Sequence, residues 1–241
     1  MGVWLQHNHI DIATMLDRLY AVRYGKGFRY GGPEFAFLYY IAKVGDKWVL
    51  IDTGFSSSEL AMDMGITMLP VRNEISAIVM PEQISDVLIT HSHWDHIDDI
   101  DKYAKARIYL SRKTFDKAVS ENCESTGRCL QDGKAHNRVC IISSGRKLLD
   151  TFTYEEVGGH AEDSGVFFFE HGDNKYCITG DECFSIDCFA NSVAIDNAYD
   201  AGKNAGFTKR CNEAGVIALP SHDGSVLLRY RQVSENIAQI V

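Results

Sequence analysis

Three histidines and an aspartate stand close together after an apolar segment, and their types and spacing suit a metal ion. Residues 86–90 have the composition of a buried strand, and His91, His93, Asp95 and His96 follow it directly. Alternate side chains of an extended chain point to the same side, so the first three are expected to face one volume, with His96 where a turn or helix begins. Imidazole nitrogen and carboxylate oxygen are ligands that Zn²⁺ takes. The segment therefore predicts a metal site.

Two pairs of apolar segments predict the β-hairpins that lead to further acidic residues. The first pair, in residues 34–52, flanks Gly45-Asp46-Lys47, and the second, in residues 165–181, flanks Gly172-Asp173-Asn174-Lys175. Gly, Asp and Asn between apolar runs are typical of hairpin turns. Each predicted hairpin runs into an acidic turn, at Asp52 in the first and at Asp181 in the second. The two halves of the chain thus show a faint internal duplication.

Helical patterns lie between the predicted strands. Strands interleaved with helices favour an α/β class of packed layers, and with no linker-like or low-complexity segment we expect a single domain over residues 1–241. The segment 123–146, rich in cysteine, serine, glycine and charge, is expected to be an irregular excursion. Helices are expected over residues 56–64, capped by a serine, and over 113–122, 202–214 and 226–240.

Composition excludes several classes of protein. Of the 241 residues, 45% are hydrophobic and 24% are charged, which is typical of a globular chain. The net charge of −9 repels phosphate backbones, so nucleic acid is not an expected partner. The chain has no run of the ~20 apolar residues that a membrane-spanning helix needs, and no signal peptide is evident. Seven cysteines, an odd number without a CxxC pair, favour reduced thiols and a cytoplasmic location.

The segment after residue 90 resembles the H-x-H-x-D-H signature of the metallo-β-lactamase superfamily, which follows a strand ending in threonine. The resemblance extends from about residue 35 to residue 222, and the further motifs occur in the order typical of that family. These motifs are Leu50-Ile51-Asp52-Thr53-Gly54, Gly158-Gly159-His160, Ile178-Thr179-Gly180-Asp181 and Leu219-Pro220-Ser221-His222-Asp223. The resemblance implies an αββα four-layer sandwich with two metals in a cleft at the strand ends.

The resemblance also implies a role for each matching residue. One metal would be held by His91, His93 and His160, and the other by Asp95, His96 and His222. Asp181 and a hydroxide would bridge the two metals. Asp95 would also relay a proton to the leaving group as the catalytic residue, and Asp52 would orient the ligand loop. The two divalent cations are expected to be zinc, although such ligand sets also accept manganese, iron or cobalt.

Within the superfamily, the chain looks most like the N-acyl homoserine lactonase branch. This likeness rests on the His93-Trp94-Asp95-His96 tetrad, on the Asp-Glu-Cys-Phe turn that begins at Asp181 and on residues 20–25. It implies hydrolysis of a lactone or related ester as the small-molecule substrate. Two departures stand out: Phe184 replaces the tyrosine that helps those lactonases bind the substrate or leaving group, and Asp98-Asp99 replaces a Gly-Gly pair. The two added carboxylates are expected to raise cation affinity and to disfavour anionic substrates.

Three alternatives remain open from the sequence. One is a thioesterase similar to glyoxalase II, and another is a mononuclear iron dioxygenase that acts on sulfur compounds. These differ from a zinc hydrolase in metal identity, since iron gives colour and oxygen consumption. The third is a non-catalytic protein that keeps the metals and binds a signalling molecule without turnover. The sequence leaves open whether the chain is a monomer or a homodimer.

Overall fold

The computed structural model describes residues 16–28, 34–122 and 124–241. Within these residues, nine strands form one mixed sheet and five strands form a second. The order of the first sheet is β13-β14-β1-β2-β3-β5-β6-β7, with β4 paired to β1. Its strands are β1 (Leu16–Phe28), β2 (Glu34–Val44), β3 (Lys47–Ile51), β4 (Thr67–Met68), β5 (Ile84–Leu88), β6 (Arg107–Ser111), β7 (Val139–Ile142), β13 (Arg231–Gln232) and β14 (Ile237–Gln239).

The second sheet carries the later motifs. Its order is β12-β11-β10-β9-β8, and β12 runs parallel to β11 while the other pairs are antiparallel. Its strands are β8 (Lys147–Leu148), β9 (Phe152–Glu156), β10 (Gly165–His171), β11 (Asn174–Gly180) and β12 (Ile217–Pro220).

Both predicted hairpins are present. Strand β2 pairs with β3 up to Val44 and Lys47, and β10 pairs with β11 up to His171 and Asn174. Gly45 and Gly172 sit in the two turns with φ of 56° and 58°, a backbone conformation that glycine adopts without steric cost. Each hairpin delivers its second strand to the same end of the two-sheet stack, where the acidic turns follow.

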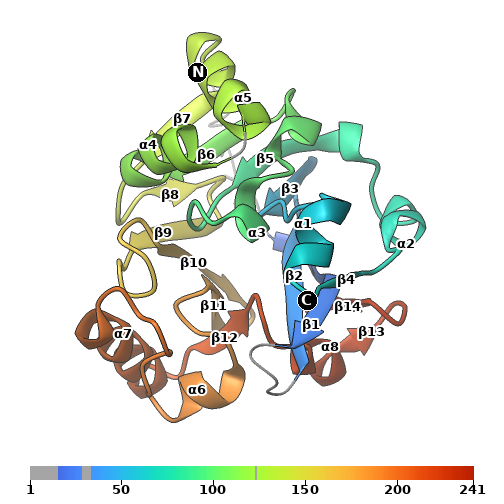
Figure 1. Cartoon of the computed structure of the whole chain (residues 1–241). Helices are drawn as coiled ribbons and strands as arrows, with labels where there is room; N and C mark the ends of the chain where they lie inside the picture. The colour runs from blue at the N-terminus through green and yellow to red at the C-terminus, as the bar shows by residue number, and fades with distance from the viewer. Residues whose placement is uncertain (1–15, 29–33, 123) are drawn as a thin grey trace, which may run out of the picture.

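Four layers result from the way these sheets are covered. The two sheets share one apolar core, in which Leu38 and Tyr40 of β2 join the same cluster as Phe167 and Ile178 of β10 and β11. The outer face of the first sheet packs against Phe115 and other apolar side chains of the helices. The outer face of the second sheet is covered by α6 and α7, as Figure 1 shows. This is the predicted αββα sandwich.

Three of the expected helices form, each capped by a side-chain oxygen. Ser57 caps α1, Ser111 caps α4 and Asp200 caps α7, and each accepts a hydrogen bond from a backbone N–H of the first turn. The helical segments are α1 (Ser58–Asp63), α2 (Arg72–Ser76), η1 (Pro81–Gln83), α3 (Trp94–Ile97), η2 (Ile100–Tyr103), α4 (Arg112–Glu121), α5 (Glu124–Ala135), α6 (Ile186–Ala190), α7 (Ala201–Glu213) and α8 (Ser225–Arg229).

Two expectations about the elements were wrong. The segment 123–146 is not an irregular excursion, because residues 124–135 form α5 and residues 139–142 form strand β7. The expected closing helix over 226–240 ends at Arg229, and β13 and β14 follow it. Strand β14 pairs with β1, where Tyr20 opposes Gln239. Residues 237–239 thus form a strand by pairing with the edge of β1, although the local sequence pattern favours a helix.

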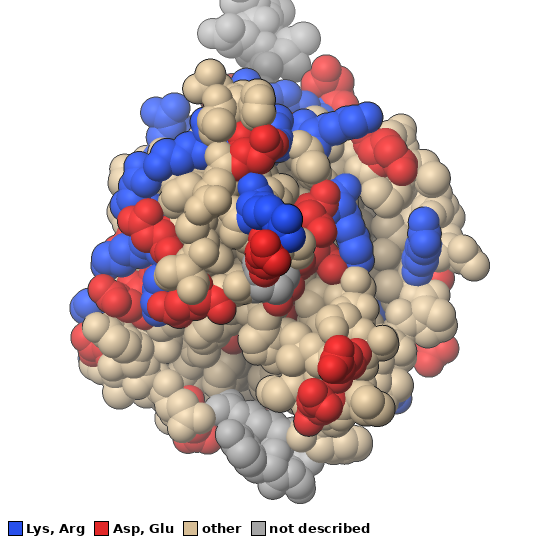
Figure 2. All heavy atoms as spheres, turned by 45° about the horizontal axis from the view of Figure 1, so that its top comes forward, with Lys and Arg blue, Asp and Glu red and all other residues tan. Residues whose placement is uncertain are grey.

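The surface charge is mixed. Figure 2 shows Lys and Arg interspersed with Asp and Glu over the face that carries α4 and α5. Ion pairs of this kind include Lys113 with Glu156 at 2.8 Å and Arg128 with Glu124 at 3.1 Å. Among the described residues, no helix is both long and apolar enough to span a bilayer.

Candidate metal centre

The predicted ligand segment connects β5 to α3. Strand β5 ends at Leu88, and the chain continues without regular structure to His93, which precedes the first turn of α3. His91 and His96 are buried, while His93 is half-buried. Asp95 does not continue an extended alternation, because it lies within the first turn of α3. The helical turn brings Asp95 beside His96, with 3.6 Å between its Oδ2 and the Nε2 of His96.

The structure brings all seven predicted ligands together in two adjoining clusters. The ligand atoms within each cluster lie within 4.8 Å of one another. Asp181 belongs to both clusters, so its carboxylate stands where a bridge between two cations would be. The clusters are His91, His93, His160 and Asp181, and Asp95, His96, Asp181 and His222.

The three predicted ligands that lie far away in the sequence all follow strands of the second sheet. His160 stands in the connection between β9 and β10, Asp181 follows β11, and His222 follows β12. Gly180 adopts φ of 49° at the end of β11, and an added Cβ there would lie 2.8 Å from Oγ1 of Thr90. Glycine at this position therefore lets the two sheets approach each other closely beside the ligands.

Hydrogen bonds fix the direction of the imidazole rings. One carboxylate oxygen of Asp52 lies 2.8 Å from Nδ1 of His96, and the same side chain accepts hydrogen bonds from the N–H and Oγ1 of Thr90. The backbone oxygen of Ala36 lies 2.8 Å from Nδ1 of His222. A proton on each Nδ1 satisfies these acceptors, so Nε2, which lies 3.0 Å from Asp181 Oδ1 in both rings, is the nitrogen that could bind a cation.

The donor set fits divalent cations. Nε2 of His91, Nε2 of His96 and Oδ1 of Asp181 are buried without a hydrogen-bond partner. Buried polar atoms in native proteins are nearly always satisfied, so three such atoms at one place need a partner that the chain does not supply. Imidazole and carboxylate groups of this kind are the ligands of zinc and similar metals.

The pKa shifts of the clustered histidines and aspartates favour the binding of positive charge at this centre. Burial lowers the pKa of His160 to about 4 and that of His91 well below its usual range, so both rings are neutral, as ligands must be. Burial also works against a charged His222, but Asp181 and Asp95 outweigh it and raise its pKa to about 9. Although burial opposes it, the neighbouring histidines hold the pKa of Asp181 well below its usual range. Both carboxylates thus carry negative charge at neutral pH.

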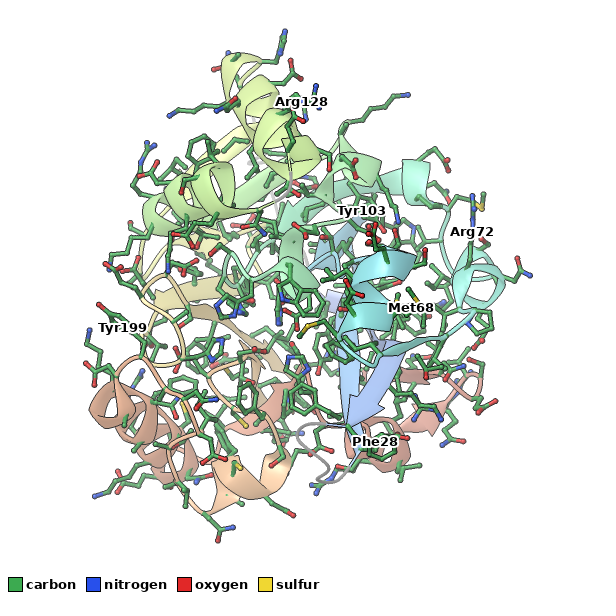
Figure 3. All side chains as sticks on the ribbon, in the orientation of Figure 1. Phe28, Met68, Arg72, Tyr103, Arg128 and Tyr199 are labelled. Carbon is green, nitrogen blue, oxygen red and sulfur yellow. The ribbon has the colours of Figure 1, made fainter. Side chains whose placement is uncertain are left out.

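An apolar cavity of about 410 Å³ opens beside the two clusters. Asp95, Asp181 and His222 form its polar end, and the rest of the described lining is apolar except for Asp63. Figure 3 shows Phe28 at the outer end of β1, on the rim of this cavity. The apolar lining comprises Gly27, Phe28, Phe35, Phe37, Met64, Ile66, Trp94 and Phe184.

Phe184 stands between the two far histidines. Its ring centroid lies 5.6 Å from that of His160 and 5.7 Å from that of His222. The position that carries a tyrosine in the lactonases therefore does face the reaction centre, and this chain presents a ring edge there without a hydroxyl.

The other departure, Asp98-Asp99, lies outside both ligand clusters. Asp98 accepts hydrogen bonds from Asn122 and Thr126, and Asp99 accepts from Lys102 at 2.6 Å and from Ser56. Neither aspartate is among the described residues that line the cavity. Their carboxylates tie α3 and η2 to neighbouring elements, and their expected effect on cation affinity stays a prediction.

Sequence reasoning missed two positioning contacts. The hydroxyl of Tyr24 donates to the backbone oxygen of Asp95 at 2.7 Å and so holds α3. Glu182, which follows Asp181, is fully buried and contacts the loop that bears His160. A glutamate directly after a strand-end ligand was the only sequence signal for the second contact.

Comparison with known families assigns the chain. The model of the metallo-beta-lactamase superfamily matches residues 31–205, so the chain belongs to that superfamily and is a metal-dependent hydrolase by class. No curated protein matches the sequence.

Several solved structures share the fold. An N-acyl homoserine lactone hydrolase with the product N-hexanoyl-L-homoserine at its catalytic metal centre has a TM-score of 0.74 at 15% identity, over 92% of this chain and 99% of its own. A quorum-quenching N-acyl homoserine lactone lactonase has a TM-score of 0.76 at 15% identity, over 93% and 100%. AidC, a dizinc quorum-quenching lactonase, has a TM-score of 0.62 at 16% identity, over 86% and 80%. These likenesses confirm the predicted fold.

Proposed function

We propose that this chain is a dinuclear metal hydrolase that opens a lactone or a related ester, of the N-acyl homoserine lactone kind. One observation carries the proposal: the carboxylate of Asp181 belongs to two preformed ligand clusters and, with Asp95 and His222, lines an apolar cavity. Solved structures of similar fold include lactonases with N-acyl homoserine products, and AidC among them is dizinc.

The ligand roles follow from the clusters. In our proposal, His91, His93 and His160 hold one cation, Asp95, His96 and His222 hold the other, and Asp181 contacts both. Two divalent cations held there, zinc in our proposal, would supply Lewis acidity that activates water as a nucleophile and polarises an ester carbonyl.

The chain's own residues supply binding and proton transfer. The aromatic side chains of the cavity bind the acyl chain and exclude water from the ester; among them, Phe35 stacks on His222 with 4.1 Å between the ring centroids. Asp95 is held on two sides, by the Tyr24 hydroxyl at its backbone oxygen and by His222, whose Nε2 is 3.4 Å from its Oδ2. From this position the carboxylate can receive a proton and return it to the leaving alkoxide.

The cavity favours a neutral ester over an anionic thioester. Its described lining contains Asp63, Asp95 and Asp181 but neither Lys nor Arg. A glutathione thioester carries carboxylates that need cationic partners, and the described residues offer none there. This observation ranks the glyoxalase-like alternative below the lactonase.

Two wider proposals accompany this function. The shared core between the sheets supports one domain for the whole of residues 1–241. The six described cysteines are unpaired, which supports a reducing compartment such as the cytoplasm.

Ring opening of an N-acyl homoserine lactone tests the proposal. We expect purified protein loaded with zinc or manganese to release protons as the ring opens, and His91→Ala to abolish turnover. His171→Ala, a change at the far end of β10, serves as the matched control and keeps full turnover. Two bound metals without turnover would refute the lactone assignment. Bound iron with oxygen consumption would instead support the dioxygenase, and tight lactone binding without hydrolysis would support the signal-binding protein.

A further inference from the structure

Glu182 is a fully buried acidic residue that the proposed chemistry does not use. It follows Asp181 at the end of β11, and its exposed fraction is 0%. Among the ion pairs of the described residues, none involves this carboxylate. An unpaired buried charge is costly unless hydrogen bonds compensate for the lost water. The hydrogen-bond donors around the Glu182 carboxylate therefore indicate which segments this residue holds in place.

Neutral donors from two segments converge on this carboxylate. Its Oε1 accepts hydrogen bonds from the backbone N–H of Gly159 at 2.8 Å and of His160 at 3.1 Å, and also from the hydroxyl of Ser164. Its Oε2 accepts from the side-chain amide of Asn204 at 2.7 Å, and that amide also donates to the backbone oxygen of Glu182 at 2.9 Å. Every bond requires an acceptor oxygen on Glu182, as a carboxylate provides.

The loop that bears His160 is closely packed where these hydrogen bonds form. An added Cβ on Gly159 would lie 2.4 Å from Oε2 of Glu182 and 2.8 Å from the Cα of Asn204. The loop backbone is therefore pressed between the carboxylate and α7. Only glycine allows this approach, and the carboxylate in turn sets where the next residue, His160, begins.

We propose that Glu182 is a positioning residue that fixes the backbone of His160 so that its ring meets His93 and Asp181. Nε2 of His160 lies 2.9 Å from Nδ1 of His93 and 3.3 Å from Oδ2 of Asp181. Because Asp181 and Glu182 are consecutive, one strand end places a bridging carboxylate and clamps the loop that bears a second ligand. The inference rests on the proposed function only in treating His160 and Asp181 as ligands.

Glu182→Gln tests this role with little change in shape. An amide keeps one acceptor oxygen but turns an N–H₂ group toward existing donors, either the backbone N–H groups or Asn204. We expect one of the two zinc equivalents to bind about 10- to 100-fold more weakly, the range found when partners of ligating groups are lost. Chelator competition measures this, and the absorption spectrum of the Co²⁺-loaded protein is expected to change at one metal. Glu162→Gln, an exposed change in the same loop, is the matched control.

A reciprocal exchange separates positioning from a general loss of folding. Asn204→Asp alone sets two carboxylates against each other and is expected to weaken the same zinc equivalent. Combining it with Glu182→Gln restores a donor–acceptor pair, while Ile195 N–H keeps its acceptor at position 204. The pair leaves the Glu182 backbone oxygen without its donor, so we expect partial recovery of zinc affinity above either single variant.

The outcomes distinguish this inference from the proposed function. Wild-type protein that binds no zinc would refute the dinuclear site itself. Two zinc equivalents bound equally tightly by wild type and Glu182→Gln would overturn the positioning role and leave the site intact. A lower melting temperature of the metal-free variant with unchanged zinc affinity would also overturn it, since that is the result of a purely structural contact. A double variant, Glu182→Gln with Asn204→Asp, that binds zinc no better than either single variant would also overturn the positioning role.

Discussion

Replacement of Asp52 by asparagine is expected to weaken metal binding through the tautomer of His96. The carboxylate lies 2.8 Å from Nδ1 of His96 and keeps a proton on that nitrogen. An amide nitrogen at the same place donates instead, which favours the proton on Nε2, the atom that faces Asp181 and Asp95. A protonated Nε2 has no lone pair for a cation.

The size of the expected loss in metal affinity follows from the burial and the hydrogen bonds of Asp52. The residue is 2% exposed, and its other hydrogen bonds come from the N–H and Oγ1 of Thr90 at 2.8 and 2.9 Å. Asparagine keeps the size and tolerates the φ of 60° at this position, so backbone strain contributes little. The remaining effect is that of losing an orienting partner, about 10- to 100-fold in metal affinity, or about 1.4 to 2.8 kcal/mol.

Zinc affinity measured by chelator competition is the assay, with lactone turnover as a second readout. Asp86→Asn is the matched control, because Asp86 is 3% exposed but lies in the middle of β5, where its carboxylate accepts hydrogen bonds from the hydroxyls of Tyr109 and Ser85 and belongs to neither ligand cluster. Both variants lose a buried carboxylate, so both are expected to lower the free energy of unfolding. Only Asp52→Asn is expected to lower zinc affinity. Unchanged zinc affinity in Asp52→Asn, or an equal loss in both variants, would refute the tautomer argument.

Phe184→Tyr restores a hydroxyl between the far histidines and is expected to raise kcat for the lactone by up to about 100-fold, in line with the effect of a single hydrogen-bond donor; an unchanged kcat would show that this position does not contact the reacting ester. Gly159→Ala places a methyl group against Glu182 and Asn204 and is expected to lower the free energy of unfolding by about 1–3 kcal/mol in urea titrations. Gly206→Ala, on the open side of α7, is expected to raise it by about 0.5–1 kcal/mol; equal stabilities of the two variants would contradict the packing described here.

Local patterns sufficed for the parts of the fold that local physics determines. Both hairpins have turn residues whose conformational preferences act within four positions, and three expected helices begin at a Ser or Asp cap. The ligand segment was readable because four ligand-type side chains occupy six consecutive positions, 91–96. The more distant ligands, such as His160 and His222, were assigned through resemblance to a family, since no local rule connects them to that segment.

Several failures involve partners that are remote in sequence. Residues 237–239 become a strand because β1 offers them an unpaired edge, and no pattern within residues 226–240 contains that information. The hydrogen-bond partners of Asp98 and Asp99 could not be read from the ligand motif, because Asn122 and Thr126, which bond to Asp98, come from a distant part of the chain. Glu182 was overlooked for the same reason, because its donors come from residues 159–164 and from α7.

Strand β1 lies inside the first sheet, between β2 and β14. Strand β2, on one side of β1, follows it directly in the sequence. Strand β14, on the other side, is the last of the described strands to be synthesised. The ligands have a similar order, with His222 some 130 residues after His91. Contacts between such distant segments cost loop-closure entropy before they stabilise anything, and they slow folding. During synthesis on the ribosome, the first sheet therefore cannot be completed before β14 has been made. The set of predicted ligands is likewise complete only once His222, near the end of the described chain, has emerged.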